Sequence, residues 1–330
     1  MTKVIAIGVK EVDKPLFEKV KDNYPFDFKQ CSDESLIKKE DLYDGIDYVI
    51  SGTPTYKFDD EYFSMLERKH IYLFIAKMTG IGNIDLNAAN KHRVTVANVQ
   101  GYSPNAISEL ALSLALSLNR SLFLIEDNLQ HNDFRMSFPF FKEIRDCIVG
   151  IYGVGRIGAT TAKIFASIGS KVIGCDPSPR KENEEFMQYV DIDELQKQSD
   201  ILILHSPYIK SENYHIVNDG FIDSMKDDAI LINVARGELV DLSAVNLAIK
   251  GNRLAGFATD VLENEQELFG KKVSEINNAF IKESLSLYPR VIITPHVGAH
   301  TLRAREAMVD IAFSQIDEYI KTGTCRFKVI

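Results

Sequence analysis

The feature that most constrains the fold is a glycine-rich turn between an apolar run and a helical pattern. Gly153, Gly155 and Gly158 follow the run 147–152 in the spacing G-x-G-x-x-G. A second apolar run, 171–175, ends at Asp176, which lies 176 − 158 = 18 residues beyond the last glycine. A dinucleotide-binding βαβ unit needs an acid about 20 residues on. The sequence therefore predicts a dinucleotide site, because the strand, the turn, the helix, the second strand and the acidic residue occur in the expected order.

Each glycine has a physical reason in such a site. Gly153 permits the tight turn, Gly155 lets the backbone approach a pyrophosphate, and Gly158 lets the helix pack closely on the strand. The free N–H groups of the first helical turn are expected to meet the phosphates.

Asp176 indicates which dinucleotide is bound. Its carboxylate is suited to accept hydrogen bonds from the adenosine ribose and to repel a 2′-phosphate, which favours NAD over NADP. Ser178 and Arg180 lie close by in the sequence and leave NADP as an alternative.

Short apolar runs alternate with helical patterns along all 330 residues, which predicts parallel βαβ units, an α/β fold and two domains. A helix that starts at Ser103-Pro104 separates two such series, and an amphipathic helix over 302–321 follows them. The expected strands are 3–8, 48–51, 71–76, 94–99, 147–152, 171–175, 200–204, 229–233, 254–258 and 291–294.

Composition excludes some classes of partner. The formal net charge of −9 argues against a nucleic-acid or membrane-surface binder, because both partners are polyanionic. The four cysteines are scattered, with no metal-ligand spacing, so we expect no metal and a reducing compartment. The N-terminal run is broken by charge and lacks the pattern of a signal peptide. We therefore expect a cytoplasmic protein.

Polar side chains follow the later strands. Ligands of open parallel sheets bind at the carboxyl ends of the strands, so these side chains are expected to meet there. The residues are His205, Ser206 and Pro207 after 200–204, Arg236 after 229–233, Asp260 and Glu265 after 254–258, and His296 after 291–294.

An arginine, a carboxylate and a histidine suit the reduction of a 2-keto acid. A histidine with a pKa near neutral can protonate the developing alkoxide. A carboxylate beside it favours the imidazolium, and an arginine fork binds the substrate carboxylate. His296 is the expected proton donor, whereas His205 is expected to line the cleft. His300 is left open as a pocket residue.

At these residues the sequence closely resembles the D-isomer-specific 2-hydroxyacid dehydrogenase family, and its upstream part resembles the D-lactate dehydrogenase branch. The resemblance covers essentially the whole chain. It is carried by VGIYGVGRIGATTAKIFASIGSKVIGCD, INVARGELVD, GFATDVLENE, TPHVGAHT, GNID and GYSPNAISEL.

The resemblance implies roles for individual residues. Arg236 would bind and polarise the substrate, Glu265 would tune the histidine, and His296 would be the general acid. The loop Lys77 to Gly80, with Thr79, would present amides to the substrate carboxylate, and Tyr102 would gate the cleft. Cofactor contacts would come from Gly153, Gly155, Arg156, Ile157, Gly158, Asp176, Ser206, Pro207, Asn213, Val234, Ala235, Arg236 and Asp260.

The resemblance also implies two doubly wound parallel-sheet domains. A flavodoxin-like substrate domain would comprise 1–101 and 300–330, and a Rossmann-type NAD domain would comprise 102–299. The active site would lie between them, and the molecule would be a homodimer joined through the cofactor domain.

The substrate is less constrained. Pyruvate is the first candidate, but Gly52 and the stretch Val297-Gly298-Ala299 are small where the D-lactate enzymes often place aromatics, which favours a roomier pocket. Hydroxyisocaproate-type or phenyllactate-type activity is therefore an alternative. Phosphoglycerate, glyoxylate or formate oxidation is another reaction of the same scaffold, and a non-catalytic NAD sensor is the alternative from a different class.

Overall fold

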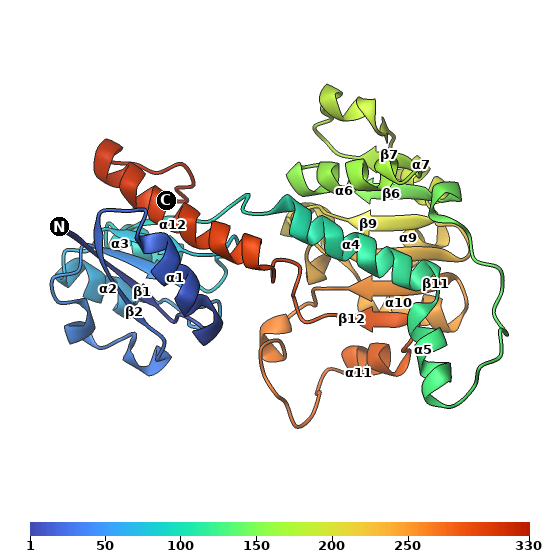
Figure 1. Ribbon diagram of the computed structural model, residues 1–330, viewed down its shortest axis with the longest axis horizontal. Helices are drawn as coiled ribbons and strands as arrows, with labels where there is room; N and C mark the ends of the chain where they lie inside the picture. The colour runs from blue at the N-terminus through green and yellow to red at the C-terminus, as the bar shows by residue number, and fades with distance from the viewer. The chain divides into compact units, whose positions relative to one another are not determined.

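The computed structural model describes residues 1–330, which fall into two compact units. Unit 1 comprises residues 1–103 and 300–330, and unit 2 comprises residues 104–299. Each unit is built around one sheet whose strands are all parallel, with helices packed on it (Figure 1). The predicted α/β fold class with two doubly wound sheets is confirmed.

The sheet of unit 1 has five strands in the order β2-β1-β3-β4-β5. This order is that of the flavodoxin-like arrangement. The strands are β1 (Thr2–Ile7), β2 (Phe26–Cys31), β3 (Tyr48–Ser51), β4 (Leu73–Ala76) and β5 (Thr95–Asn98), and the helices are α1 (Lys14–Lys21), α2 (Asp60–Arg68), α3 (Leu86–Lys91) and α12 (Leu302–Thr322).

Strand β2 was not predicted from the sequence. Its sequence FDFKQC alternates apolar and polar side chains, and it contains no continuous apolar run. It lies at the edge of the sheet and pairs only with β1, and its Asp27 and Lys29 side chains are exposed. A search for continuous apolar runs misses such an edge strand.

The sheet of unit 2 has seven strands in the order β12-β11-β10-β9-β6-β7-β8. Strand β6 therefore lies between β7 and β9, where the winding of the chain reverses. The strands are β6 (Ile148–Tyr152), β7 (Lys171–Cys175), β8 (Gln188–Tyr189), β9 (Ile201–Leu204), β10 (Ala229–Asn233), β11 (Leu254–Thr259) and β12 (Val291–Ile293). The helices are α4 (Pro104–Asn119), α5 (Leu122–Gln130), α6 (Arg156–Ser167), α7 (Ile192–Gln198), α8 (Lys210–Asn213), α9 (Asp219–Asp223), α10 (Leu242–Lys250) and α11 (Ala279–Ser286).

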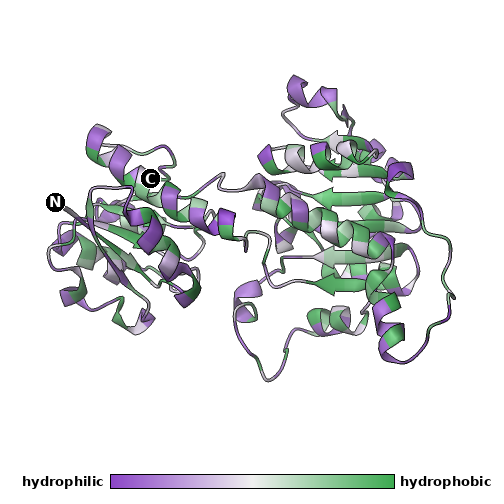
Figure 2. Cartoon of the chain, viewed as in Figure 1, coloured by the Kyte–Doolittle hydropathy of each residue, from purple (hydrophilic) through white to green (hydrophobic).

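Helices cover both faces of the unit 2 sheet, which is why its central strands are mostly apolar. Ile201 and Ile203 of β9 pack with α4 and α6, whereas Leu202 and Leu204 pack with α7, α9 and α10. Figure 2 shows the strands as the most hydrophobic part of each unit and the outer helices as mixed. The burial of both faces keeps the strands rigid, so the loops at their carboxyl ends are held in place.

No single helix is long and apolar enough to cross a membrane. Helices α4 and α5 pass such a test of length and composition only as a pair, and they are bent by 60° at the break between them. In the fold, α4 packs against α6, β10 and β11 with its apolar side chains, so its hydrophobicity has a structural cause.

Candidate active site

The glycine-rich turn has the geometry of a phosphate-binding turn. Gly153 has a φ of +90°, and a Cβ there would lie 2.6 Å from the backbone N of Ser206. A Cβ on Gly158 would lie 2.0 Å from the carbonyl O of Gly153. In contrast, a Cβ on Gly155 would meet nothing within 4 Å. Two glycines are therefore needed for packing, and the third leaves open space above the backbone.

The open space lies at the start of α6, a helix of 12 residues. Gly155 is its N-cap, and no side chain caps the helix end. The first amides of α6 are thus available to an anion, and the helix dipole favours one there. The turn therefore fits the pyrophosphate of a dinucleotide.

Asp176 lies directly after β7, beside this turn. Its Oδ2 accepts a hydrogen bond from the backbone N of Val154 at 2.7 Å, and its Oδ1 accepts one from the backbone N of Ser178 at 2.8 Å. The carboxylate therefore braces the glycine turn. This bracing role was not predicted from the sequence.

A second loop beside the turn is organised by Asn213. Its Nδ2 donates to the carbonyl O of Pro207 at 2.7 Å and to Oγ of Ser206 at 3.3 Å, and its Oδ1 accepts from the backbone N of Ile209. Ser206 also touches Gly153 through its backbone. The structure thus brings Ser206, Pro207 and Asn213 together next to the glycine turn.

The chain after β10 is shaped by a buried asparagine, Asn233. Its Nδ2 donates to the carbonyl O of Arg236 at 2.8 Å, and its Oδ1 accepts from the backbone N of Ala235 at 3.1 Å. Val234 and Ala235 are buried, and the Arg236 side chain is exposed. The role of Asn233 was not predicted from the sequence. The feature that could have indicated it is a side-chain amide at the last position of an otherwise apolar strand.

His296 and Glu265 form the closest charged pair at this edge. Nδ1 of His296 lies 2.5 Å from Oε1 of Glu265, while Oε2 of Glu265 accepts from the backbone N of Leu262. The hydrogen bond to Glu265 raises the pKa of His296 above its ordinary value, against an opposing effect of burial and of nearby Arg236. Arg236, Glu265 and His296 are therefore brought together after three adjacent strands. The sequence predicted this, because each residue follows a buried parallel strand.

The backbone of His296 is unusual, with a φ of +55°. Its amide donates to the carbonyl O of Thr294 at 3.0 Å. A non-glycine residue in the left-handed region is uncommon, although eight other non-glycine residues of this chain share it. The surrounding hydrogen bonds must hold it.

Asp260 provides those bonds. Its Oδ1 accepts from Oγ1 of Thr294 at 2.6 Å and from the backbone N of Val297 at 2.8 Å. Its Oδ2 accepts from the backbone N of Gly298 at 2.8 Å. Asp260 is buried, and its carboxylate fastens the segment 294–298 on both sides of His296.

Gly237 fixes the distance between the arginine segment and the glutamate segment. A Cβ on Gly237 would lie 2.1 Å from the carbonyl C of Leu262 and 2.2 Å from the backbone N of Glu263. The two loops are therefore in direct backbone contact, and only glycine permits it. Sequence reasoning missed this residue, since its spacing belongs to no glycine motif.

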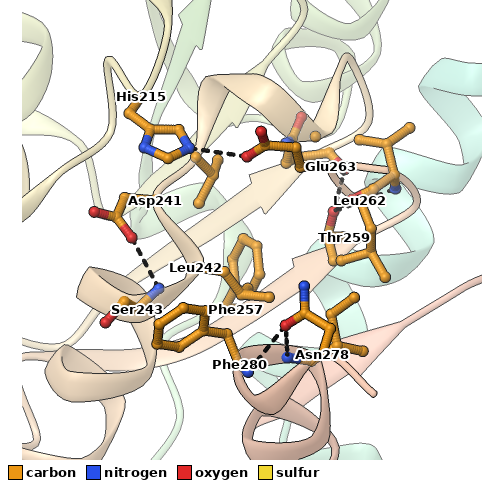
Figure 3. A pocket seen from close by; sticks show the side chains of 15 residues that line it. His215, Asp241, Leu242, Ser243, Phe257, Thr259, Leu262, Glu263, Asn278 and Phe280 are labelled. Carbon is orange, nitrogen blue, oxygen red and sulfur yellow. Dashed lines mark hydrogen bonds and ion pairs between the residues drawn. The ribbon is translucent and has the colours of Figure 1, made fainter. Parts of the chain in front are cut away.

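A cavity of about 150 Å³ adjoins this contact, and Gly237, Leu262 and Glu263 belong to its lining (Figure 3). Leu242, Phe257 and Phe280 line it, and Nε2 of His215 faces the carboxylate of Glu263 at 3.1 Å. This contact holds the side chain of Glu263, while Gly237 meets the backbone of Leu262 and Glu263. The loop that carries Glu265 is thus clamped at Glu263 by two segments that are distant from it in the sequence.

The remaining predicted residues lie in unit 1. Lys77 follows β4; its amide donates to the carbonyl O of Ser51 at 2.9 Å, and its ammonium lies 2.5 Å from Asp13. Oγ1 of Thr79 donates to the carbonyl O of Val99 at 2.8 Å. The amides of Met78, Thr79 and Gly80 donate no hydrogen bond within the protein. Tyr102 is half-buried at the end of this unit.

His205 differs from His296 in its electrostatics. Burial lowers its pKa to about 3, and its Nε2 lies 2.9 Å from Oγ1 of Thr161. A ring that is neutral at physiological pH is a poor general acid. His300 is exposed at the first residue of the returning part of unit 1.

Comparisons with known proteins agree with this geometry. Residues 112–298 match the model of the D-isomer specific 2-hydroxyacid dehydrogenase NAD binding domain. An aromatic 2-oxoacid reductase from Clostridium sporogenes is 36% identical over 286 residues, covering 86% of this chain and 85% of that protein. A D-lactate dehydrogenase from Lactiplantibacillus plantarum is 33% identical over 328 residues, covering 97% of each chain. The crystal structure of a D-lactate dehydrogenase from Treponema pallidum is similar over 100% of both chains, with a TM-score of 0.94 at 29% identity.

Proposed function

The chain belongs to the D-isomer-specific 2-hydroxyacid dehydrogenase family, and from this premise we propose that it reduces 2-oxo acids with a side chain larger than the methyl group of pyruvate. It is an NAD-dependent oxidoreductase that acts on D-2-hydroxy acids. The finer question is which acid it prefers and which residues perform each step.

The observation that supports the preference is the small size of Gly52, Gly80 and Gly298 and the open space at one of them. A Cβ on Gly52 would lie 3.1 Å from the carbonyl O of Gly8, and one on Gly298 would lie 3.1 Å from Oδ2 of Asp260. By contrast, a Cβ on Gly80 would meet nothing within 4 Å. Gly52 and Gly298 are thus closely packed, and room for a bulkier substrate is supported by the open space at Gly80 and by the absence of aromatic side chains at Gly52 and Val297-Gly298-Ala299. The similarity to an aromatic 2-oxoacid reductase supports the same substrate class.

Pyruvate is the second candidate, because two relatives that align with 97% of the chain are D-lactate dehydrogenases. One methylene of pocket contact changes specificity by only ~1–3 kcal/mol, so both acids can be substrates. The reaction is the same for both substrate classes, and only their relative kcat/KM values distinguish the two proposals.

The cofactor, when bound, supplies the hydride that reduces the C2 carbonyl. We propose that it is held in unit 2, the dinucleotide-binding domain. The residues proposed to hold it are Gly153, Gly155, Arg156, Ile157, Gly158, Asp176, Ser206, Pro207, Asn213, Val234, Ala235, Arg236 and Asp260.

The chain's own residues then handle the proton and the carboxylate. We propose that the imidazolium of His296 donates its Nε2 proton to the developing alkoxide, since Nδ1 is bonded to Glu265. The exposed guanidinium of Arg236 binds the substrate carboxylate and polarises the carbonyl. Asp260 keeps His296 in place by holding the backbone around it.

Unit 1 is proposed as the substrate domain. The unpaired amides of Thr79 and Gly80 form an anion-binding turn suited to the substrate carboxylate. Lys77 anchors the start of this turn, and Tyr102 is proposed to contact the substrate.

We also propose a homodimer in the cytoplasm. Large apolar side chains are exposed on the segment 122–140, including Phe134, Met136 and Phe140, and Met136 is 95% exposed. Contiguous exposed apolar side chains are typical of an interface. Light scattering of the purified protein tests this state, and a monomer at micromolar concentration would contradict it.

The test of the function is a panel of 2-oxo acids with NADH, followed by absorbance and by chiral analysis of the product. We expect the D-product, with kcat/KM for phenylpyruvate or 4-methyl-2-oxopentanoate about 10-fold above that for pyruvate. A higher kcat/KM for pyruvate would reverse the preference. Failure of every acid would favour an NAD sensor.

A further inference from the structure

A buried charge cluster lies in unit 1, outside the residues that perform the chemistry. Asp13 precedes α1, Lys77 follows β4, and Arg305 lies in the first turn of α12. Asp13 is 1% exposed and Lys77 is 2% exposed. Buried charges of this kind are costly unless paired, so the arrangement needs an explanation.

The contacts of the cluster are well defined. Nε of Arg305 donates to Oδ1 of Asp13 at 2.9 Å, and a second guanidinium N–H reaches Oδ2 of the same carboxylate. Nζ of Lys77 donates to Oδ2 of Asp13 at 2.5 Å. The Lys77 ammonium also lies 5.4 Å from the ring centroid of Phe17 in α1. Asp13 thus ties α12 to the residue that begins the 77–80 turn.

The cluster is not neutral. Two cations share one carboxylate, which leaves a formal charge of 2 − 1 = +1. Lys10, also a cation, acts on the Lys77 ammonium in addition to Arg305. One positive charge is therefore held at the base of a turn whose amides at Met78, Thr79 and Gly80 have no partner.

We propose that Asp13, Lys77 and Arg305 are positioning residues that set the affinity of the 77–80 turn for the substrate carboxylate, by fixing the turn and by holding one positive charge beneath it. This inference rests on the proposed role of that turn in binding the 2-oxo acid. Lys77 acts without touching the substrate, because its amide and its ammonium are both engaged within the protein.

The cluster also gives the affinity a pH dependence. Burial lowers the pKa of Lys77 to about 8, with Arg305 and Lys10 adding to the lowering and Asp13 opposing it. The pKa of Asp13 is lowered, because the bonds from Arg305 and Lys77 outweigh its burial. Lys77 is charged below this pKa and neutral above it, so the extra positive charge is lost as the pH rises through about 8.

The test compares Lys77→Met, which removes the charge, with Lys77→Arg, which keeps it and does not titrate. Lys91→Met is the matched control, since Lys91 is an exposed lysine of the same unit paired with Asp60. KM for the preferred 2-oxo acid, kcat and the Kd for NADH are measured from pH 6.5 to 9.5.

We expect Lys77→Met to raise KM about 10-fold, the effect of losing ~1.4 kcal/mol of charge interaction, with kcat and the Kd for NADH little changed. Lys77→Arg should restore KM and remove the rise in KM above pH 8 that the parent shows. Lys91→Met should resemble the parent in every measurement.

An unchanged KM in Lys77→Met, or the same pH dependence of KM in Lys77→Arg and the parent, would overturn this inference. If Lys77→Met does not fold, the comparison of Lys77→Arg with the parent still decides. A parent protein that reduces no 2-oxo acid would instead overturn the proposed function, so the two failures are distinguishable.

Discussion

Nδ1 of His296 lies 2.5 Å from Oε1 of Glu265, and Nε2 of the same ring has no hydrogen-bond partner within the protein. The carboxylate therefore fixes the orientation of the imidazole and leaves one nitrogen for the substrate. Because the hydrogen bond raises the pKa of His296, the ring stays protonated to a higher pH than an ordinary histidine.

Glu265→Gln tests this relationship. Without the carboxylate, the pKa of His296 should fall, so the imidazolium needed for reduction is lost at a lower pH. We expect kcat/KM for reduction at pH 8 to fall on the order of 10-fold, with a smaller loss at pH 6. The measurement is the pH profile of kcat/KM from pH 5.5 to 9.5. An alkaline limb at the same pH as in the parent would show that Glu265 does not control the proton donor.

Gly237→Ala tests the clamp on the glutamate loop. The new Cβ would lie 2.1 Å from the carbonyl C of Leu262, so the loop must move and carry Glu265 away from His296. Since misplacing a catalytic group by about 1 Å can cost ~10²-fold in rate, we expect a drop of at least about 10-fold in kcat. Steady-state kinetics and a thermal melt separate the loss of activity from unfolding.

The matched control is Gly220→Ala in α9, where the nearest atom to an added Cβ is 3.5 Å away. That variant should keep the activity of the parent. If Gly237→Ala were equally active, the backbone contact would have no part in placing Glu265.

Asp176→Asn tests the choice of cofactor. The amide oxygen can still accept a hydrogen bond from Val154 or Ser178, but the charge that repels a 2′-phosphate is gone. We expect the ratio of kcat/KM for NADH to that for NADPH to fall about 10-fold, the effect of ~1.4 kcal/mol. An unchanged ratio would mean that the discrimination lies elsewhere, for example in the residues around Arg180.

Much of this fold could be predicted from the sequence, because central parallel strands are buried on both faces and form continuous apolar runs. Ten such runs correspond to strands within one or two residues. Strands β2 and β8 were missed because both lie at sheet edges, where alternation or shortness hides the signal.

The site residues that could be predicted are those whose side chains have a specific chemical role and whose position follows a recognisable strand. His296, Glu265 and Arg236 follow buried strands, so a strand-end rule finds them. Asn233 and Gly237 act through contacts between segments distant in the sequence, and no local pattern encodes such contacts. The pairing of Asp13 with Arg305 spans 292 residues and belongs to the same class.

The most direct test of the account is the rate of reduction by His296→Gln with saturating NADH and the preferred 2-oxo acid. Glutamine keeps a polar side chain of similar length but cannot supply a proton. We predict that kcat falls on the order of 10²–10⁴-fold while the Kd for NADH stays within about 2-fold of the parent, because the proposed cofactor contacts lie on other residues. A kcat within about 10-fold of the parent would contradict the assignment of His296 as the proton donor.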